Sequence, residues 1–399
     1  SAAAIYGTRG TNGVVLITTK KVRSDMPSTI EWNSYVTTQV ITKYLDMMDA
    51  EDIKDLAAQG KPGAFNYGSN TNWIDEIFRT PVSHSHNVSM KGGTTNSNYI
   101  VNLNYKALQG LMLKSDNSVF NARIEANHSM FDGKVKINAN IMGYDQKYFS
   151  GASGSSWRSD VYRYALIYNP TDPVKDANGN WTEHLDNNYR NPVSLIMETD
   201  GEIHVTNIRP FGTITYSPIK GLTFKALGSR NLYSSNSGYY ETSKNVQSIL
   251  SNRKGYAAKS TGESNEDLLE LTATYLRSLG RHNLTLLGGY TYNKATSESF
   301  SANNYNFPSD LYSYNNLSLG TARTSGLAGM SSGKSSSKLI SYFARANYNY
   351  AEKYLLMASI RYEGSTKFGE DNKWGAFPSV SAGWNIIRES FMENIPVIS

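Results

Sequence analysis

The sequence contains no cysteine, which excludes disulfides, thiolate metal sites and thiol nucleophiles. It also lacks any run of about 18 apolar residues, so it encodes no transmembrane helix. Charged residues make up only 18% of the 399 residues, against roughly 25% in a typical soluble domain. The net charge is +5, and Lys and Arg are scattered along the chain, which gives nucleic-acid binding no support.

Tyrosine, by contrast, is abundant. The chain has 28 Tyr and 13 Phe, and aromatic residues reach 12% of the total. Tyrosine favours strands, and its ring is apolar while its hydroxyl prefers water. The excess therefore favours a sheet with many half-wet positions, such as those at a membrane interface. The negative mean hydropathy does not oppose this, because barrel strands expose only alternate residues to lipid.

Apolar and polar residues alternate in several segments. Residues 135–144 place Val135 and Ile137 on one face and Lys136 on the other, and residues 340–350 alternate in the same way. Successive strand side chains point to opposite faces, so this period of two predicts half-buried strands. We expect twelve strands, at about 28–38, 82–91, 97–107, 118–129, 134–146, 202–217, 221–232, 267–278, 283–297, 338–350, 353–364 and 377–387.

The connections between these strands differ in length in a regular way. The even-numbered connections are tight turns, such as 92–96 and 351–352. The odd-numbered ones are longer, and four of them are much longer, at 39–81, 147–201, 233–266 and 298–337. Short turns at one end and long loops at the other are typical of outer-membrane barrels. We therefore predict an all-β fold, a transmembrane antiparallel β-barrel of which about twelve strands are present.

The long loops carry structure of their own. Residues 45–59 have helical periodicity, and residues 72–79 are expected to form a short helix before Pro81. The Ser/Gly-rich segment 331–337 indicates a mobile loop. The first residues, Ser1 to Gly7, have neither the basic nor the apolar region of a signal peptide, so we expect the chain to be a fragment or a processed protein.

Three segments carry a family resemblance. The first is Ala3-Ala4-Ile5-Tyr6-Gly7-Thr8-Arg9-Gly10-Thr11-Asn12-Gly13-Val14-Val15-Leu16-Ile17-Thr18-Thr19-Lys20. The second is Asn72-Trp73-Ile74-Asp75-Glu76-Ile77-Phe78-Arg79-Thr80, followed by a strand that ends at Gly92-Gly93. The third and most specific runs from Arg361-Tyr362-Glu363-Gly364-Ser365-Thr366-Lys367-Phe368-Gly369 to Lys373-Trp374-Gly375-Ala376-Phe377-Pro378-Ser379-Val380-Ser381-Ala382-Gly383-Trp384. Together these segments resemble the SusC/RagA type of TonB-dependent outer-membrane transporter.

The resemblance implies a domain division and a function. Residues 1–22 would be the C-terminal end of a plug domain, with a motif of Tyr6, Gly7, Arg9, Gly10, Asn12 and Gly13, and residues 23–399 the N-terminal part of the barrel. The complete protein would be a 22-stranded plugged transporter in the outer membrane of a Gram-negative bacterium. It would import oligosaccharides or peptides with energy from TonB, reached through a region ahead of this chain, and beneath a SusD-like surface lipoprotein. The family is not enzymatic and implies no cofactor.

Two other functions are compatible with the sequence. One is a siderophore or vitamin receptor of the same membrane class, which works without the lipoprotein lid. The other is a soluble all-β domain that binds carbohydrate or acts as an adhesin, which the negative mean hydropathy favours. The second alternative requires the apolar strand faces to meet inside a compact sandwich rather than face lipid.

Motifs for metal, phosphate or catalysis are weak. The segment 176–180 starts like a calcium loop, but Trp181 occupies the position of its required glycine, so a Gly/Asn turn is favoured. Gly333-Lys334-Ser335 ends like a phosphate-binding loop but lacks the first glycine. His84 and His86 share one strand face without a third ligand, which favours a polar lumen face over a metal site. No catalytic set is present.

The aromatic residues of the long loops are the best binding candidates. Aromatic rings pack against the apolar faces of sugars and against peptide side chains. Packing of the loops against one another is an equally good explanation of the same residues. The candidates for an extracellular substrate cavity are Trp157, Tyr162, Tyr164, Trp181, Tyr239, Tyr240, Tyr312 and Tyr314.

Overall fold

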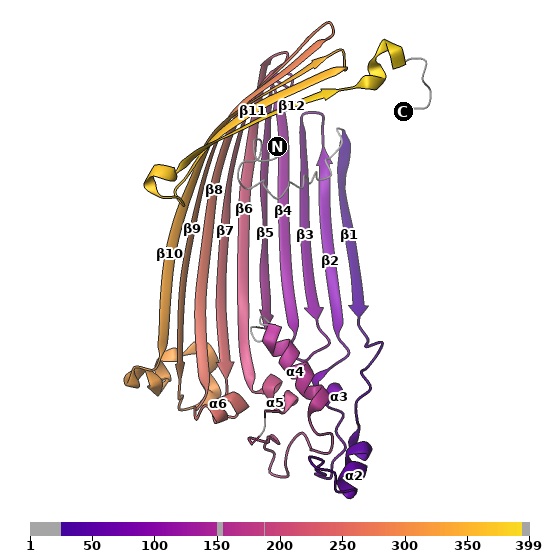
Figure 1. Ribbon diagram of the computed structural model, residues 1–399, viewed down its shortest axis with the longest axis vertical. Coiled ribbons are helices and arrows are strands. Elements are labelled where there is room, and N and C mark those ends of the chain that lie inside the picture. The colour runs from indigo at the N-terminus through magenta and orange to yellow at the C-terminus, as the bar shows by residue number, and fades with distance from the viewer. Residues whose placement is uncertain (1–24, 150–154, 187, 393–399) are drawn as a thin grey trace.

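The computed structural model describes residues 25–149, 155–186 and 188–392, with the side chains of 155–159 left out. Twelve strands form a single antiparallel sheet in which each strand pairs with its neighbours in the sequence (Figure 1). The strands are β1 (Met26–Thr38), β2 (Val82–Gly93), β3 (Ser97–Gln109), β4 (Asp116–Met130), β5 (Val135–Phe149), β6 (Thr199–Ile219), β7 (Leu222–Glu241), β8 (Tyr256–Leu279), β9 (His282–Tyr305), β10 (Gly329–Tyr350), β11 (Tyr354–Ser365) and β12 (Trp374–Trp384).

The helices lie in the connections and after the last strand. The α-helices are α2 (Ala50–Ala58), α3 (Trp73–Ile77), α4 (Ser155–Ile167), α5 (Pro192–Met197) and α6 (Val246–Leu250). The 3₁₀ helices are η3 (Asp310–Asn315), η4 (Leu317–Leu319), η5 (Thr321–Ser325), η6 (Glu370–Asn372), η7 (Ile386–Arg388) and η8 (Ser390–Met392). No helix within the described ranges is long and apolar enough to span a membrane.

The expected strands and the two classes of connection are confirmed. Tight turns lie at one end of the sheet and the long helix-bearing loops at the other (Figure 1). The turn between β10 and β11 places Ala351 and Glu352 at positive φ, 52° and 57°, as the two central residues of a type I′ turn require, and the Lys353 amide donates to the Tyr350 carbonyl at 2.9 Å. The Glu352 amide donates to the Asn349 side chain at 2.8 Å, which fixes this turn.

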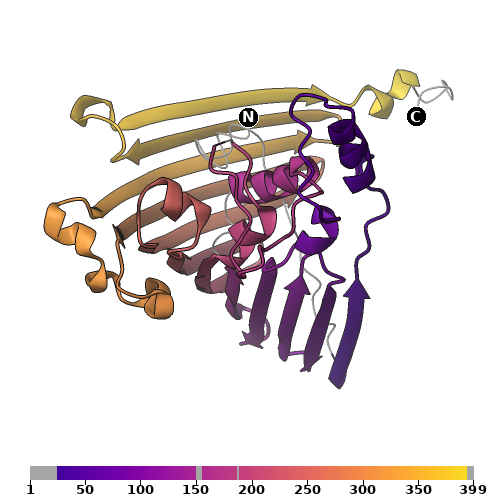
Figure 2. The ribbon, with the colours of Figure 1, turned by 90° about the horizontal axis from the view of Figure 1, so that it is seen from below.

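One face of the sheet is apolar and exposed. Val101, Ile124 and Ile141 lie side by side in register on β3, β4 and β5, and Ile124 and Ile141 are 50% and 53% exposed. Figure 2, seen from the long-loop end, shows the sheet curved into a trough. These residues lie on the outer side of the curve, because Tyr240, which shares their strand face by register, donates to Asp310 of the η3 segment outside it. We call this side the convex face. Its apolar rows meet no second layer of protein within the described chain, which is contrary to a soluble sandwich.

The opposite, concave face is polar and crowded. Asn138 donates to Glu125 at 3.2 Å and to Asn127 at 2.7 Å, so amides and carboxylates link neighbouring strands. Further along the sheet, Arg361 and Glu363 are only 3% and 5% exposed, and the Arg361 Nε donates to the Glu363 carboxylate at 2.9 Å. Buried polar groups need such partners. A face of this kind suits a wet interior and not lipid.

Aromatic residues border the apolar band of the convex face on both sides. Nearer the long loops, Tyr362 stacks on Trp374 with ring centroids 4.9 Å apart, and Tyr342 lies beside them. Nearer the tight turns, Tyr350 stacks on Tyr354. Tyr342 and Tyr350 are eight residues apart on one strand, about 27 Å along it. This agrees with a tilted strand that crosses an apolar band of about 25 Å between two aromatic girdles.

Three local predictions were wrong. Residues 331–337 do not form a mobile loop but belong to β10, where they pair with residues 295–301 of β9. β8 begins at Tyr256, eleven residues before the expected start, and it pairs with the end of β7. The helix expected over 45–59 is shorter, because α2 begins after Asp49. In the two strands, a polar segment lacked the alternation that only the lipid-facing part of a strand requires.

His84 and His86 do not face the lumen. They share the strand face of Val88, which pairs with Trp32 and Leu103 on the convex side. The two imidazoles are hydrogen-bonded to each other, with Nδ1 of His84 3.1 Å from Nε2 of His86. The pair lies near the long-loop end of β2. Polar side chains are tolerated there because that part of the strand lies beyond the apolar band.

Candidate functional site

Two long loops are joined at the open end of the trough. The Ser69 amide donates to the Thr171 carbonyl at 2.8 Å, and the Thr71 amide donates to the Pro170 carbonyl at 2.8 Å. The Asn169 side chain donates to the Phe65 carbonyl at 2.7 Å. These bonds connect the loop between β1 and β2 with the loop between β5 and β6, so the two form one assembly.

Capping residues determine where the helices of this assembly begin. Asp49 caps α2 by accepting from the Glu51 and Asp52 amides, and Asp52 completes a capping box by accepting from the Asp49 amide. Asn72 caps α3, and Asn191 caps α5, whose first residue is a proline. Short helices like these are stable only with such caps and with packing against the rest of the assembly.

A small hydrophobic core holds the helices together. Trp73 is 2% exposed, packs edge-on against Tyr168 at 4.9 Å, and donates from Nε1 to the Asn169 carbonyl at 3.0 Å. Ile77 of α3 and Val161 of α4 are fully buried in the same core. The assembly is therefore a packed unit above the sheet and positions the side chains on its surface.

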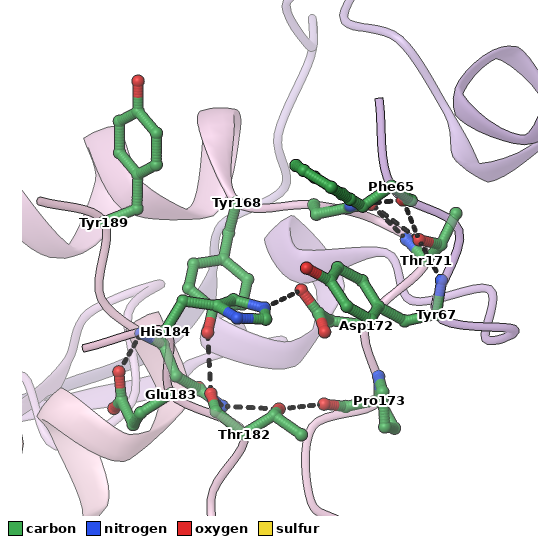
Figure 3. Close-up of polar contacts among 12 residues, drawn as sticks. Phe65, Tyr67, Tyr168, Thr171, Asp172, Pro173, Thr182, Glu183, His184 and Tyr189 are labelled. Carbon is green, nitrogen blue, oxygen red and sulfur yellow. Dashed lines mark hydrogen bonds and ion pairs between the residues drawn. The ribbon is translucent and has the colours of Figure 1, made fainter. Parts of the chain in front are cut away.

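A pocket of about 530 Å³ opens in this assembly, and we call it the loop pocket. His184 is one of its lining residues, and we call the part of the lining that it forms the floor. The His184 Nε2 lies 2.8 Å from the Asp172 carboxylate (Figure 3). The Tyr67 ring packs on the imidazole with centroids 4.9 Å apart, although Tyr67 comes from the other loop. Most of the remaining lining is apolar or aromatic and includes Met47, Met48, Phe65, Leu166, Tyr168 and Tyr189.

Burial determines the electrostatics of the loop pocket. It raises the pKa of Asp172, and the hydrogen bond from His184 acts in the opposite direction. Removal from water also raises the pKa of Tyr67, and the charges of Asp172 and Asp186 add to that effect. Tyr168, whose hydroxyl donates to the Thr182 carbonyl at 2.7 Å, has its pKa raised mainly by burial. Both tyrosines therefore remain neutral hydrogen-bonding groups at physiological pH.

This arrangement is suited to binding. Methionine and aromatic side chains offer an adaptable apolar surface, and the oriented imidazole offers one polar contact at the floor. No cluster of three or more His, Asp or Glu that could hold a metal ion occurs among the residues that the structure describes. The His184–Asp172 hydrogen bond and the bond from Tyr168 to the Thr182 carbonyl fix the orientation of these polar groups.

A second cluster of aromatic residues lies on the other flank of the sheet. Tyr240 is 1% exposed and packs against Phe307, and its hydroxyl donates to Asp310 of η3 at 2.7 Å. The Tyr314 ring covers Gly238, where a Cβ would lie 2.3 Å from it. The register places Tyr240 on the convex face, and Figure 2 shows the η3–η5 segment, in orange, outside the curve of the sheet.

The predicted aromatic residues are thus not gathered at one place. Tyr162, Tyr164 and Trp181 belong to the loop assembly, where Trp181 donates from Nε1 to Glu198 at 2.6 Å. Trp157 lies on α4, and its side chain is outside the described residues. Of the remaining four, Tyr240 and Tyr314 belong to the second cluster and Tyr312 lies beside it on η3. Tyr239 lies on the opposite face of β7, where its hydroxyl donates to Glu241 at 2.9 Å and its ring packs against Tyr256. Their role in substrate contact stays a prediction.

Sequence reasoning missed the residues at the floor of the loop pocket. Tyr67 and Thr171, whose side chain accepts from the Tyr67 amide at 3.0 Å, are separated by 104 residues. His184 and Asp172 are twelve residues apart in a loop without periodicity. No local pattern joins them. The one feature of the sequence that indicates order in these loops is the capping residues of their helices, Asp49, Asn72 and Asn191.

The weaker motifs can also be placed. Asp176 accepts from the Asn178 and Asn180 amides at 2.9 and 2.8 Å, and Gly179 has a positive φ, so this segment is a tight turn. Gly333, Lys334 and Ser335 lie within β10, and Lys334 is ion-paired with Glu298, so the phosphate-loop interpretation is wrong. The plug motif of residues 6–13 lies outside the described residues.

Comparison with known proteins gives consistent results, although no family model matches the chain. The TonB-dependent receptor P3 of Formosa agariphila is 30% identical over the whole chain, which covers 40% of that receptor. The TonB-dependent receptor SusC of Bacteroides thetaiotaomicron is 27% identical, again over the whole chain and 41% of that protein. Among solved structures, the RagAB peptide transporter matches with a TM-score of 0.77 at 20% identity. The match covers 98% of this chain and 48% of the RagAB chain. The chain thus spans about two fifths of the length of the curated relatives that it matches.

Proposed function

We propose, from the premise that this chain belongs to the SusC/RagA type of TonB-dependent receptor, that the complete protein imports oligosaccharides or peptides across the outer membrane. The activity is transport and not catalysis. The proposal concerns a longer protein, because the chain covers only part of its relatives. In that protein, residues 1–22 would end a plug domain and residues 23–399 would begin the barrel.

The observation that carries the proposal is the division of the sheet into two faces. The convex face presents exposed apolar residues between two aromatic girdles, and the concave face presents buried charges and amides. A β-sheet with one apolar and one polar face is suited to separate lipid from a water-filled interior. The long-loop end then faces the outside of the cell, which puts the loop assembly where a substrate arrives.

Partners follow from the same premise. Transport by this family depends on TonB, and we propose that TonB acts through a region outside this chain. A SusD-like surface lipoprotein would close over the long-loop end. The bacterium would be Gram-negative, and the barrel would cross its outer membrane many times. The name of the RagAB structure, a peptide transporter, makes peptides one of the substrate classes to test.

Within this function, the loop pocket is the proposed place of first substrate contact. Its lining includes methionines and aromatic rings, and His184 at its floor is hydrogen-bonded to Asp172. Tyr162 of α4 lines an adjoining pocket of about 330 Å³ that shares Met47 and Met48 with the loop pocket. Trp157, Tyr164 and Trp181 belong to the same assembly, and we propose that they extend the contact surface.

The test is uptake by cells. A strain deleted for the gene is grown on a panel of glycans and peptides as the sole nutrient, and labelled substrates are followed into the periplasm. We expect a defect on one class of substrate that the complete gene restores. Normal growth and uptake on every substrate of the panel would contradict the proposal. A strain that lacks TonB should reproduce the same defect, and uptake independent of TonB would exclude this family's mechanism.

A further inference from the structure

Two lysines face each other directly on the convex face. Lys294 of β9 and Lys338 of β10 are register partners, and both share the strand face of the apolar residues Tyr292 and Ile340. Lys338 is exposed and Lys294 is half-buried. Like charges directly opposite each other on neighbouring strands destabilise a sheet. A cost of this kind is expected where the site is occupied by a group of opposite charge.

Neighbouring carboxylates do not neutralise this pair. Asp267 of β8 is the register partner of Lys294 on its other side, but it also forms an ion pair with Arg230 at 3.5 Å. Within the described chain, neither Lys294 nor Lys338 has an ion pair of its own. The row therefore contains three cations, Arg230, Lys294 and Lys338, and one carboxylate.

Hydroxyl donors lie in the next row toward the long loops. Thr296 and Ser336 are register partners on the same two strands, and their hydroxyl oxygens lie 3.4 Å apart. Two ammonium groups and two hydroxyls on adjacent strands make a donor set that suits phosphate oxygens. One row further, Lys334 is already paired with Glu298 at 2.7 Å, so the donor set ends there.

The position of the pair indicates the source of the phosphate. The row directly beneath it contains Tyr292, Ile340 and Trp374, which belong to the aromatic girdle nearer the long loops. The lysines thus lie immediately above the apolar band, at the level of the lipid headgroups. A free anion in solution would not require apolar and aromatic residues beside its site, whereas the acyl chains of a lipid would.

We propose that Lys294 and Lys338, with Thr296 and Ser336, bind the phosphate of a phosphorylated glycolipid in the outer leaflet, whose acyl chains lie along Tyr292, Ile340 and Trp374. The lipid bridges the two lysines and removes the repulsion between them. This inference depends on the outer-membrane placement but not on which nutrient is imported.

The experiment measures lipid retained by the complete receptor. The protein is purified in a neutral detergent and titrated with micelles that contain bisphosphorylated lipid A, and bound lipid is counted by native mass spectrometry. The double variant Lys294→Gln/Lys338→Gln should retain on the order of tenfold less lipid A, because both charge-assisted contacts are lost. The variant Lys334→Gln is the matched control, since it removes one charge from the same face where Glu298 already neutralises it.

Thermal unfolding gives a second readout, in which the variant is expected to be no less stable than the wild type without lipid and to gain less stability than the wild type with lipid. Without lipid, Lys294→Gln should unfold at the same or a higher temperature than the wild type, because the repulsion is gone. With lipid A, the wild type should gain more stability than the variant. Equal loss of lipid in the Lys334→Gln control would show diffuse charge attraction and overturn the proposal, and so would unchanged retention in the double variant.

Two further arms separate the sources of phosphate. Lipid A without its phosphates, and inorganic phosphate alone, should each bind much more weakly than the intact lipid. Inorganic phosphate that competes fully with lipid A would show a free-anion site and overturn the lipid assignment. Nutrient uptake is measured in the same variants and should be unchanged, so a failure of the transport proposal is visible independently of this one.

Discussion

Nε2 of His184 lies 2.8 Å from Oδ2 of Asp172, a carboxylate that is only 2% exposed. The carboxylate fixes the ring of the imidazole against Tyr67, which comes from a different loop. The pair therefore links the two loops from within the loop pocket and sets the orientation of the one imidazole at its floor. A buried acceptor of this kind is a positioning group, since it acts on a ligand through His184.

Replacing the carboxylate should weaken substrate binding. The variant Asp172→Ala leaves the imidazole without its acceptor, and we expect affinity for the imported substrate to fall on the order of tenfold in the complete receptor. Asp176→Ala is the control, because that carboxylate lies exposed in a turn of the same loop. Isothermal titration with the purified receptor measures both variants. Equal affinity in the two would place the substrate elsewhere.

Tyr67 and Tyr312 distinguish the two aromatic clusters. Tyr67 lines the loop pocket, whereas Tyr312 is 49% exposed on η3 at the outer flank of the sheet. We expect Tyr67→Ala to weaken substrate binding on the order of tenfold, because it removes an aromatic ring that lines the pocket, and Tyr312→Ala to leave it unchanged. The opposite result, measured by the same titration, would transfer the substrate site to the second cluster.

Trp73 should carry much of the stability of the loop assembly. Trp73→Ala removes a nearly buried ring and its hydrogen bond to the Asn169 carbonyl, at a cost of about 3–5 kcal/mol in local stability. Hydrogen exchange of the amides of residues 65–77 should accelerate accordingly, while exchange in β8 and β9 stays slow. The exposed residue Leu311, changed to Ala, serves as the control. Unchanged exchange would mean that Trp73 does not hold the loops together.

The pH dependence of the loop after β7 follows from Glu241. Burial raises its pKa above the ordinary value of 4.5, while the hydrogen bond from Tyr239 and the charge of Arg253 oppose this. The ionised form is thus disfavoured in the folded protein. Stability is fully present below about pH 4.5 and is lost as the pH rises through the raised pKa.

Glu241→Gln tests this directly. Glutamine still accepts the Tyr239 hydroxyl bond but carries no charge, so residues 241–256 should exchange more slowly than in the wild type at pH 8 and equally fast at pH 4. The exchange rates must first be corrected for the intrinsic effect of pH. The exposed residue Glu263, changed to Gln, should show no such difference. A difference that grows toward low pH would reverse the sign of the argument.

Gly364 allows Trp374 to lie flat in the girdle. A Cβ at this position would lie 2.5 Å from the Trp374 ring, so Gly364→Ala should displace the ring from Tyr362 and cost about 1–3 kcal/mol. Tryptophan fluorescence should shift, and the unfolding temperature should fall. Gly288→Ala is the control, because it lies on the same convex face with no atom within 4 Å of the added carbon. A fall of equal size in both variants would reflect loss of glycine itself.

The lipid-facing part of the sheet could be predicted because lipid imposes a strict pattern. Where β9 crosses the apolar band, the lipid-facing positions must not be charged or strongly polar, and the segment 284–292 shows this at every second residue. Beyond the band both faces of a strand meet water, so alternation disappears. For this reason residues 256–266 and 331–337 have the composition of loops although they are strands.

The candidate site was predictable only in part. Asn72-Trp73 predicted a capped helix, and α3 begins there because the Asn72 side chain accepts from the next amides. The loop pocket itself was not predictable, since Phe65 and Asn169 meet through a backbone carbonyl that any residue has. Contacts of this kind leave no mark on either segment alone. The histidine pair at 84 and 86 was assigned to the wrong face, because the prediction followed the polarity of the imidazoles and not their alternation with the neighbouring apolar residues of the strand.

β9 is paired without interruption with β8 from His282 to Tyr305 and with β10 from His282 to Asn303. Its side chains therefore alternate strictly between the two faces of the sheet over 24 residues. A single-codon deletion within this strand would turn Lys294 toward the lumen and Asn293 toward the acyl chains, together with every residue on one side of the lesion. Insertions and deletions are thus expected to be tolerated in the connecting loops, where side chains need not alternate between two faces, and to be lost by selection from the strand.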